Sequence, residues 1–210
     1  MSLSMSAPTL AHFRTDDWEP ALRRDAWSDT AHRWVDFRPA SDMPLEAELT
    51  ILASEACVLG TTRSSAYEMR TGSHRSQPDD MVVLTLMQTG AMLPDAHPRK
   101  GAGALSLCAP REAGRFRWEQ DTRQVFLTLP RSDAAAALGR EPTTQLLSER
   151  CVLAPALASQ MNHMALLVRL SDKIDAQEYA GMLDATRALA LLTLRNLGRQ
   201  GAGVDLPDLT

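Results

Sequence analysis

The sequence predicts an α+β fold, in which one helix and an antiparallel β-barrel are followed by an antiparallel helical hairpin. Two observations carry this prediction. Between residues 35 and 129, about eight short apolar runs recur, separated by Gly, Pro and Asp, at the spacing typical of a sandwich or barrel. After residue 140, the apolar residues instead recur with the period of helices almost to the end of the chain.

The N-terminal part is expected to form a helix and then a strand. Thr15 can serve as an N-cap, and two acidic residues follow it in the first turn, where the helix dipole favours them. The predicted helix runs from residue 15 to residue 32. Val35 and Phe37 then alternate with polar residues and predict a short strand that Pro39 ends.

The strands of the predicted barrel follow in order. Residues 45–53 show the clearest alternation of apolar and polar side chains, which is typical of a half-buried strand. The apolar run 81–89 stops at Gly90, where a turn is permitted, and residues 91–97 are expected to pair back. The other expected strands cover residues 56–62, 64–71, 104–109, 115–119 and 122–129.

The C-terminal part is expected to be helical. A short alanine-rich helix covers residues 132–139, and two longer helices cover residues 155–170 and 175–197. Asp175 and Glu178 have the spacing of a capping box at the start of the last helix. Because the connection between the two long helices is short, they should lie antiparallel. These patterns divide the chain into three regions, a barrel with its N-terminal helix (12–140), a helical hairpin (141–198) and a linker-like tail (199–210).

Composition excludes some classes of function. The chain of 210 residues has a formal net charge of -4 and a pI near 5.7, whereas a domain that binds nucleic acid by itself usually has a basic face. Three widely spaced cysteines fit a reducing compartment. With neither a secretory signal nor an apolar run of membrane-spanning length, we expect a cytoplasmic protein that does not contact a membrane.

The sequence gives little support for catalysis or metal binding. The strand region holds only His74 and His97, no His-x-His pair occurs, and a first-row metal needs a complete set of ligands. There is no Gly-x-Ser-x-Gly motif and no glycine-rich phosphate loop ahead of a helix. We therefore expect no catalytic residues, no metal, no cofactor and no enzymatic activity.

Both long helices are apolar over a face wider than one neighbouring element needs. One side can pack on the barrel, and the remainder would be exposed in a monomer. Large exposed apolar patches usually mark a protein interface. The alternative is that both faces are simply core.

Four stretches resemble the N-terminal sensing domain of AraC/XylS-type transcription regulators, in particular those with an AraC-binding-like, cupin-related domain. They are YEMRT (67–71), VVLTLMQTG (82–90), GAGALSLCAP (101–110) and QVFLTLPRSDAAAALG (124–139). The resemblance covers most of residues 12–197. The chain departs from the family pattern at Ala104, where an Asp usually follows the glycine, and at Leu93 and Pro94, where a Gln is usual.

The resemblance implies a cupin-like barrel that senses a small organic effector, a hairpin that forms a homodimer, and DNA contact only through a helix-turn-helix part that is absent from this chain. The candidate effector-binding residues are Arg63, Tyr67, His74, His97 and Trp118. The candidate interface residues are Met182, Leu183, Thr186 and Leu189. Leu183→Glu is then expected to give a monomer with a folded barrel.

Two other functions remain open at this point. The same barrel could belong to a cupin-like metal-dependent enzyme, which bound metal would reveal. It could also be a ligand-free dimeric interaction module, which a barrel filled by its own side chains would favour.

Overall fold

The computed structural model describes residues 8–31, 36–40, 43–71, 81–95, 98–109, 114–119, 121–169 and 174–202. The helices are a 3-10 helix (Thr15–Asp17), α1 (Arg23–Ala31), α2 (Arg131–Leu138), α3 (Ala154–Val168) and α4 (Ala176–Ala202). The strands are β1 (Thr9–Arg14), β2 (Asp36–Pro39), β3 (Ala47–Ala53), β4 (Val58–Ser64), β5 (Tyr67–Thr71), β6 (Met81–Thr89), β7 (Met92–Pro94), β8 (Leu105–Cys108), β9 (Gly114–Trp118), β10 (Thr122–Pro130) and β11 (Gln145–Leu146).

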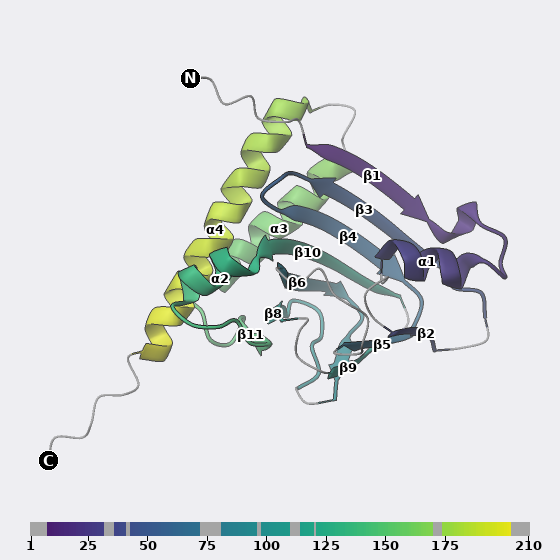
Figure 1. Cartoon of the computed structure of the whole chain (residues 1–210), viewed down its shortest axis with the longest axis horizontal. Helices are drawn as coiled ribbons and strands as arrows, with labels where there is room; N and C mark the ends of the chain where they lie inside the picture. Colours follow the sequence, from purple (N-terminus) through teal and green to yellow (C-terminus); the bar gives the residue numbers. More distant parts are fainter. Residues whose placement is uncertain are drawn as a thin grey trace, which may run out of the picture.

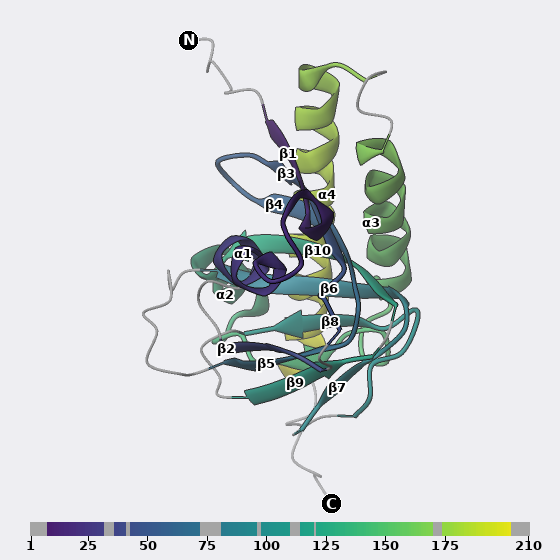
Figure 2. The ribbon, with the colours of Figure 1, turned by 90° about the vertical axis from the view of Figure 1, so that its right-hand side faces the viewer.

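The strands form two antiparallel sheets that face each other as the walls of a flattened barrel (Figure 2). The larger sheet has the order β1-β3-β4-β10-β6-β8-β11, and the smaller has the order β2-β5-β9-β7. Helices α3 and α4 lie on the outer side of the larger sheet, as Figure 1 shows. The molecule therefore has three layers: a helical layer, the large sheet and the small sheet.

Each gap between layers holds its own apolar core. The helices and the outer face of the large sheet share one cluster, which includes Leu59, Leu127, Met161 and Leu183. The space between the two sheets holds a second cluster that is rich in aromatic side chains. The predicted α+β fold, a barrel followed by an antiparallel hairpin, is confirmed.

The hairpin is fixed by local contacts at both of its ends. Asp175 and Glu178 form the predicted capping box, because each side chain accepts a hydrogen bond from the other's backbone N–H, at 2.8 and 3.2 Å. Near the other end of α4, Gly198 lies directly against the backbone of Leu138 in α2, and an added Cβ would lie 2.2 Å from the Leu138 carbonyl oxygen. Only glycine allows the two helices to cross this closely.

The N-terminal region differs from its prediction. Thr15 is not an N-cap, because its hydroxyl donates to the Ala47 carbonyl and accepts from the Ala47 N–H, at 3.2 and 2.8 Å. The backbone at Trp18 is extended, and α1 begins only after Pro20, at Arg23. The predicted end at residue 32 lies outside the described residues. Strand β1 was not predicted, because it is an edge strand whose side chains are almost all exposed.

Smaller differences affect single elements. Residues 92–94 do form a strand, but it pairs with β9 rather than with β6. The two-residue strand β11 was not predicted and extends the large sheet beyond β8. Helix α4 continues to Ala202 and so includes the first residues of the predicted linker. No helix in the described part of the chain is long and apolar enough to cross a membrane.

Candidate functional site

Two of the predicted effector-binding residues, Tyr67 and Trp118, lie between the two sheets. They are direct partners across β5 and β9, and their rings stack with centroids 4.6 Å apart and planes 7° apart. The Phe37 ring lies 5.1 Å from that of Tyr67. Tyr67 is 2% exposed and Trp118 is 5% exposed, so both side chains are packed as core.

The polar atoms of this stack also face inward. The Trp118 indole Nε1 donates a hydrogen bond to Gln124 Oε1 at 3.3 Å. Burial raises the pKa of the Tyr67 phenol far above its usual value, so the hydroxyl stays neutral. The stack belongs to the cluster that fills the space between the sheets, formed by Trp27, Phe37, Leu45, Ala47, Leu49, Tyr67, Met87, Met92 and Trp118.

One cation lies buried beside this core. Lys100 is 2% exposed, and its backbone forms a β-bridge with Met92. Its Nζ lies 4.0 Å from Cys108 Sγ. Within the described part of the chain, no carboxylate forms an ion pair with it. A buried ammonium with so weak a partner costs stability.

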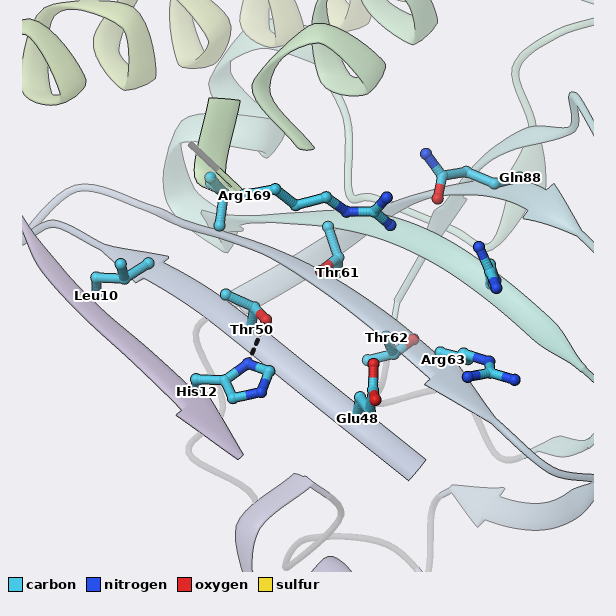
Figure 3. A pocket seen from close by; sticks show the side chains of 11 residues that line it. Leu10, His12, Glu48, Thr50, Thr61, Thr62, Arg63, Gln88 and Arg169 are labelled. Atoms are coloured by element: carbon cyan, nitrogen blue, oxygen red, sulfur yellow. Dashed lines mark hydrogen bonds between the residues drawn. The ribbon is translucent and has the colours of Figure 1, made fainter. Parts of the chain in front are cut away.

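A groove of about 490 Å³ lies instead on the outer face of the large sheet, where the end of α3 meets the strands (Figure 3). Cross-strand register explains why this part of the sheet is polar. Leu52 and Leu59 are cross-strand partners that are buried beneath the helices. Two residues further along the strands, the next pair of side chains on the same face of the sheet is Thr50 and Thr61, which are polar. The groove is lined by Leu10, His12, Glu48, Thr50, Thr61, Thr62, Arg63, Gln88, Arg123, Val168 and Arg169.

The strand side of the groove contributes two arginines and an amide. Arg63 of β4 and Arg123 of β10 are direct cross-strand partners. The register of β10 against β6 shifts between Arg123 and Gln124, which leaves Gln88 as the extra residue of a β-bulge. Gln88 Nε2 donates to Asn162 Oδ1 of α3 at 2.8 Å, so the bulge connects the sheet to the helix.

The helix side contributes Arg169, the C-cap residue of α3, whose backbone N–H bonds the carbonyls of Leu166 and Leu167. The Tyr179 hydroxyl of α4 also donates to the Leu167 carbonyl, so the start of α4 holds the end of α3 in place. Figure 3 shows the Arg169 side chain extending from α3 over the sheet toward Gln88. The groove is therefore built jointly by the barrel wall and the hairpin.

Polar contacts around the groove leave its cations poorly neutralised. Glu48 Oε1 lies 3.3 Å from Arg14 Nη2. Arg63 Nη2 lies 3.9 Å from the carboxylate of Asp121, which is largely exposed, so this ion pair is weak. Neither Arg123 nor Arg169 forms an ion pair with any other described residue.

Of the predicted effector-binding residues that the structure describes, it brings Tyr67 and Trp118 together but places Arg63 apart from them. Tyr67 and Trp118 are in the inter-sheet core, and Arg63 lines the outer groove. His74 and His97 lie outside the described residues. Sequence reasoning missed Arg123 and Arg169. In the sequence, one is an isolated arginine at the start of a predicted strand and the other an isolated arginine near the end of a predicted helix, and neither position indicates a binding site.

The predicted interface residues differ in burial. Leu183 and Thr186 are 0% exposed inside the chain, so neither has a surface that a second chain could contact. The Thr186 hydroxyl donates to the Met182 carbonyl and accepts from Gln160 of α3. Met182 and Leu189 are half-buried at the edge of the helical core. Among the residues that the structure describes, no three His, Cys, Asp or Glu side chains gather as a metal site.

Comparison with solved structures finds a match over most of the chain. The chain is similar to the AraC-like transcriptional activator CuxR, with a TM-score of 0.69 and 17% identity over 96% of this chain and 81% of that one. At this identity the similarity shows the fold. KdgF from Halomonas sp. (TM-score 0.30, 13% identity, 46% of this chain, 86% of that one) and EutQ from Clostridium difficile (0.32, 11%, 45%, 76%) match less than half of the chain.

The family follows from sequence. A search of curated proteins found no match. The model of the AraC-binding-like domain, however, matches residues 25–195, which include both the barrel and most of the hairpin. The resemblance inferred from the four sequence stretches is thereby confirmed. The chain belongs to the AraC-binding-like domain family.

Proposed function

We propose that this chain is the effector-sensing and dimerisation domain of an AraC-type transcription regulator, and that the effector binds in the outer groove. One observation carries this proposal: the groove is shared by the barrel wall, through Arg63 and Arg123, and by the hairpin, through Arg169. The space between the sheets is a poorer alternative, because the described side chains that line it pack together as an aromatic-rich core.

A ligand in the groove would act by a population shift. A molecule that contacts both the sheet and Arg169 binds best where the end of α3 lies close to β4 and β10, and its differential affinity favours that arrangement. Tyr179 connects the end of α3 to α4, and Gln160 connects the middle of α3 to Thr186 of α4. The arrangement of the groove is thus coupled to the helix that we assign to the dimer.

The dimer face that we propose is an exposed stripe on α4. Its residues recur at heptad spacing, and most of them are small, which lets a partner helix approach closely. Leu192 is the largest apolar residue of the stripe and is 47% exposed, and the predicted residues Met182 and Leu189 lie beside the stripe. The stripe consists of Gly181, Ala185, Ala188, Leu192 and Arg195.

Sedimentation velocity tests the dimerisation part. The wild-type chain is expected to be a dimer, and Leu192→Glu is expected to be a folded monomer, because a charge in place of the largest apolar side chain of the interface opposes association. Leu22→Glu is the matched control: Leu22 is 54% exposed but lies beside α1, so this variant should remain a dimer. A wild-type monomer, or a dimer in Leu192→Glu, contradicts the assigned face.

A reporter tests the sensing part and separates it from a ligand-free dimeric module, which the filled barrel interior favours. The whole chain is fused to a DNA-binding domain that acts only as a dimer, and reporter output is measured across growth media. Sensing predicts an output that varies with medium and that loses this variation in Arg169→Ala. An output that is constant across all media identifies a ligand-free module.

A further inference from the structure

We propose that the outer groove binds a small molecule carrying a phosphate group, held by the guanidinium groups of Arg63, Arg123 and Arg169. This inference rests on the proposed function, because it names the chemical class of the effector for the same groove. Three observations support it: a like-charged pair on adjacent strands, a local excess of positive charge, and the hydrogen-bonding groups around it.

The first observation is the pairing of Arg63 with Arg123. Their backbones are in direct register across β4 and β10, and both side chains lie on the outer face. Like charges directly opposite each other on neighbouring strands destabilise a sheet. Arg169 adds a third positive charge from α3 above the same face. An anion bound between the three side chains removes this repulsion.

The second observation is the balance of charge within the groove. The whole chain is acidic, with a formal net charge of -4, so the cluster is not a by-product of a basic protein. Glu48 is the one carboxylate among the described lining residues; it forms an ion pair with Arg14 and is the cross-strand partner of Arg63 on β3, so it offsets one of the three arginine charges at most. Asp121 contacts Arg63 only at 3.9 Å. The groove therefore retains a positive field that attracts anions.

The third observation is the size and chemistry of the surroundings. A volume of about 490 Å³ lies within the range of sites that hold small organic molecules. Thr50, Thr61 and Gln88 line the same space and offer hydroxyl and amide groups to the uncharged part of a ligand. Leu10 and Val168 supply a small apolar wall.

Phosphate matches three arginines better than a carboxylate does. A phosphate monoester carries nearly two negative charges and three terminal oxygens, whereas a carboxylate carries one charge and two oxygens. Guanidinium groups bind phosphate oxygens through paired N–H donors. Two such groups from the sheet and one from the helix can surround a tetrahedral phosphate, which leaves its ester substituent to face the threonines.

The experiment measures thermal unfolding and calorimetric binding of the whole chain with three probes: inorganic pyrophosphate, ribose 5-phosphate and citrate, each compared with sodium chloride at equal ionic strength. The proposal predicts saturable stabilisation by at least one of the two phosphates and weaker stabilisation by citrate, which carries more charge than ribose 5-phosphate but presents it on separate planar carboxylates rather than on one tetrahedral group. Binding by pyrophosphate alone indicates an inorganic phosphate site, and tighter binding of ribose 5-phosphate indicates an organic ester.

Variants make the test specific. Arg123→Gln and Arg169→Gln should weaken binding of the phosphate probe by about tenfold to a hundredfold, because each loses a charged hydrogen-bonding partner. Arg123→Gln should also raise the thermal midpoint of the ligand-free chain, because it relieves repulsion with Arg63. Arg117→Gln is the matched control, since Arg117 is an exposed strand arginine on the other sheet, and it should change neither value.

Several results would overturn the proposal: no saturable binding of either phosphate, tighter binding of citrate, or binding that survives in both groove variants. The dimer dissociation constant is measured with and without the bound phosphate. If phosphate binds at the arginines but leaves dimerisation unchanged, the phosphate site stands and the proposed coupling fails. The two proposals can therefore fail separately.

Discussion

Substitution of Leu183 in the middle of α4 tests whether this residue is core or interface. The sequence placed it in a dimer interface, where Leu183→Glu gives a folded monomer. In the structure, Leu183 is 0% exposed and belongs to the cluster between the helices and the large sheet. A charged side chain there would have to enter the core, so the two accounts predict opposite outcomes.

The magnitude follows from burial. Truncation of a buried leucine to alanine costs about 2–5 kcal/mol, so Leu183→Ala should lower the free energy of unfolding by that amount. Leu183→Glu adds the cost of desolvating a carboxylate, which is several kcal/mol more or requires the group to be protonated. Because a domain of this kind is stable by only about 5–15 kcal/mol, Leu183→Glu should lose the packing of the hairpin on the barrel.

Urea unfolding followed by far-UV circular dichroism, together with light scattering, measures both outcomes. Asp184→Ala is the control on the neighbouring exposed position, and its free energy of unfolding should stay within about 0.5 kcal/mol of the wild type. A soluble Leu183→Glu monomer with wild-type cooperativity and midpoint would refute the burial of Leu183.

Two further substitutions test other parts of the fold by their thermal midpoints. Gly198→Ala should lower the free energy of unfolding by about 1–3 kcal/mol, because its Cβ would meet the Leu138 carbonyl oxygen at 2.2 Å; an unchanged midpoint contradicts the close crossing. The control is Gly181→Ala, where no atom of this chain lies within 4 Å; measured in the Leu192→Glu background, so that the proposed dimer face does not contribute, its higher helix propensity should stabilise α4 by up to about 1 kcal/mol. Lys100→Met should raise the free energy of unfolding by about 1–3 kcal/mol, because it removes a buried ammonium whose described partner is the Cys108 thiol. A fall in the midpoint of Lys100→Met would mean that the ammonium has a stronger partner.

The elements with a strong pattern could be predicted from the sequence. Strands β3, β6 and β10 have regular apolar faces, and the capping box at Asp175 and Glu178 has a fixed spacing. Strand β1 lacked such a signal, because almost every side chain in it is exposed, so it shows no apolar face that would mark it as a strand. The start of α1 was mistaken because Thr15 uses its hydroxyl for a contact with Ala47, which is distant in sequence.

The groove could not be predicted, because its residues meet only through register. Arg63 and Arg123 are sixty positions apart, and a shift of one residue in either strand would place one of them on the opposite face. Arg169 joins them from the end of a helix. Similarly, the apolar pattern of α4 shows a wide apolar face but does not say which part packs inward. Leu183 proved to be core, whereas Leu192 faces solvent.

Helix α4 packs on the core along one face and has a close contact near each of its ends, which limits how it can move. Tyr179 ties its first turn to the end of α3, and Gly198 sits against Leu138 near its other end. A helix of 27 residues is about 40 Å long and stiff, so a small displacement at the groove is carried along its whole length. With Gly198 acting as a pivot, that displacement becomes a rotation. The direction of the helix at Ala202 then changes more than the position of Ala202 does.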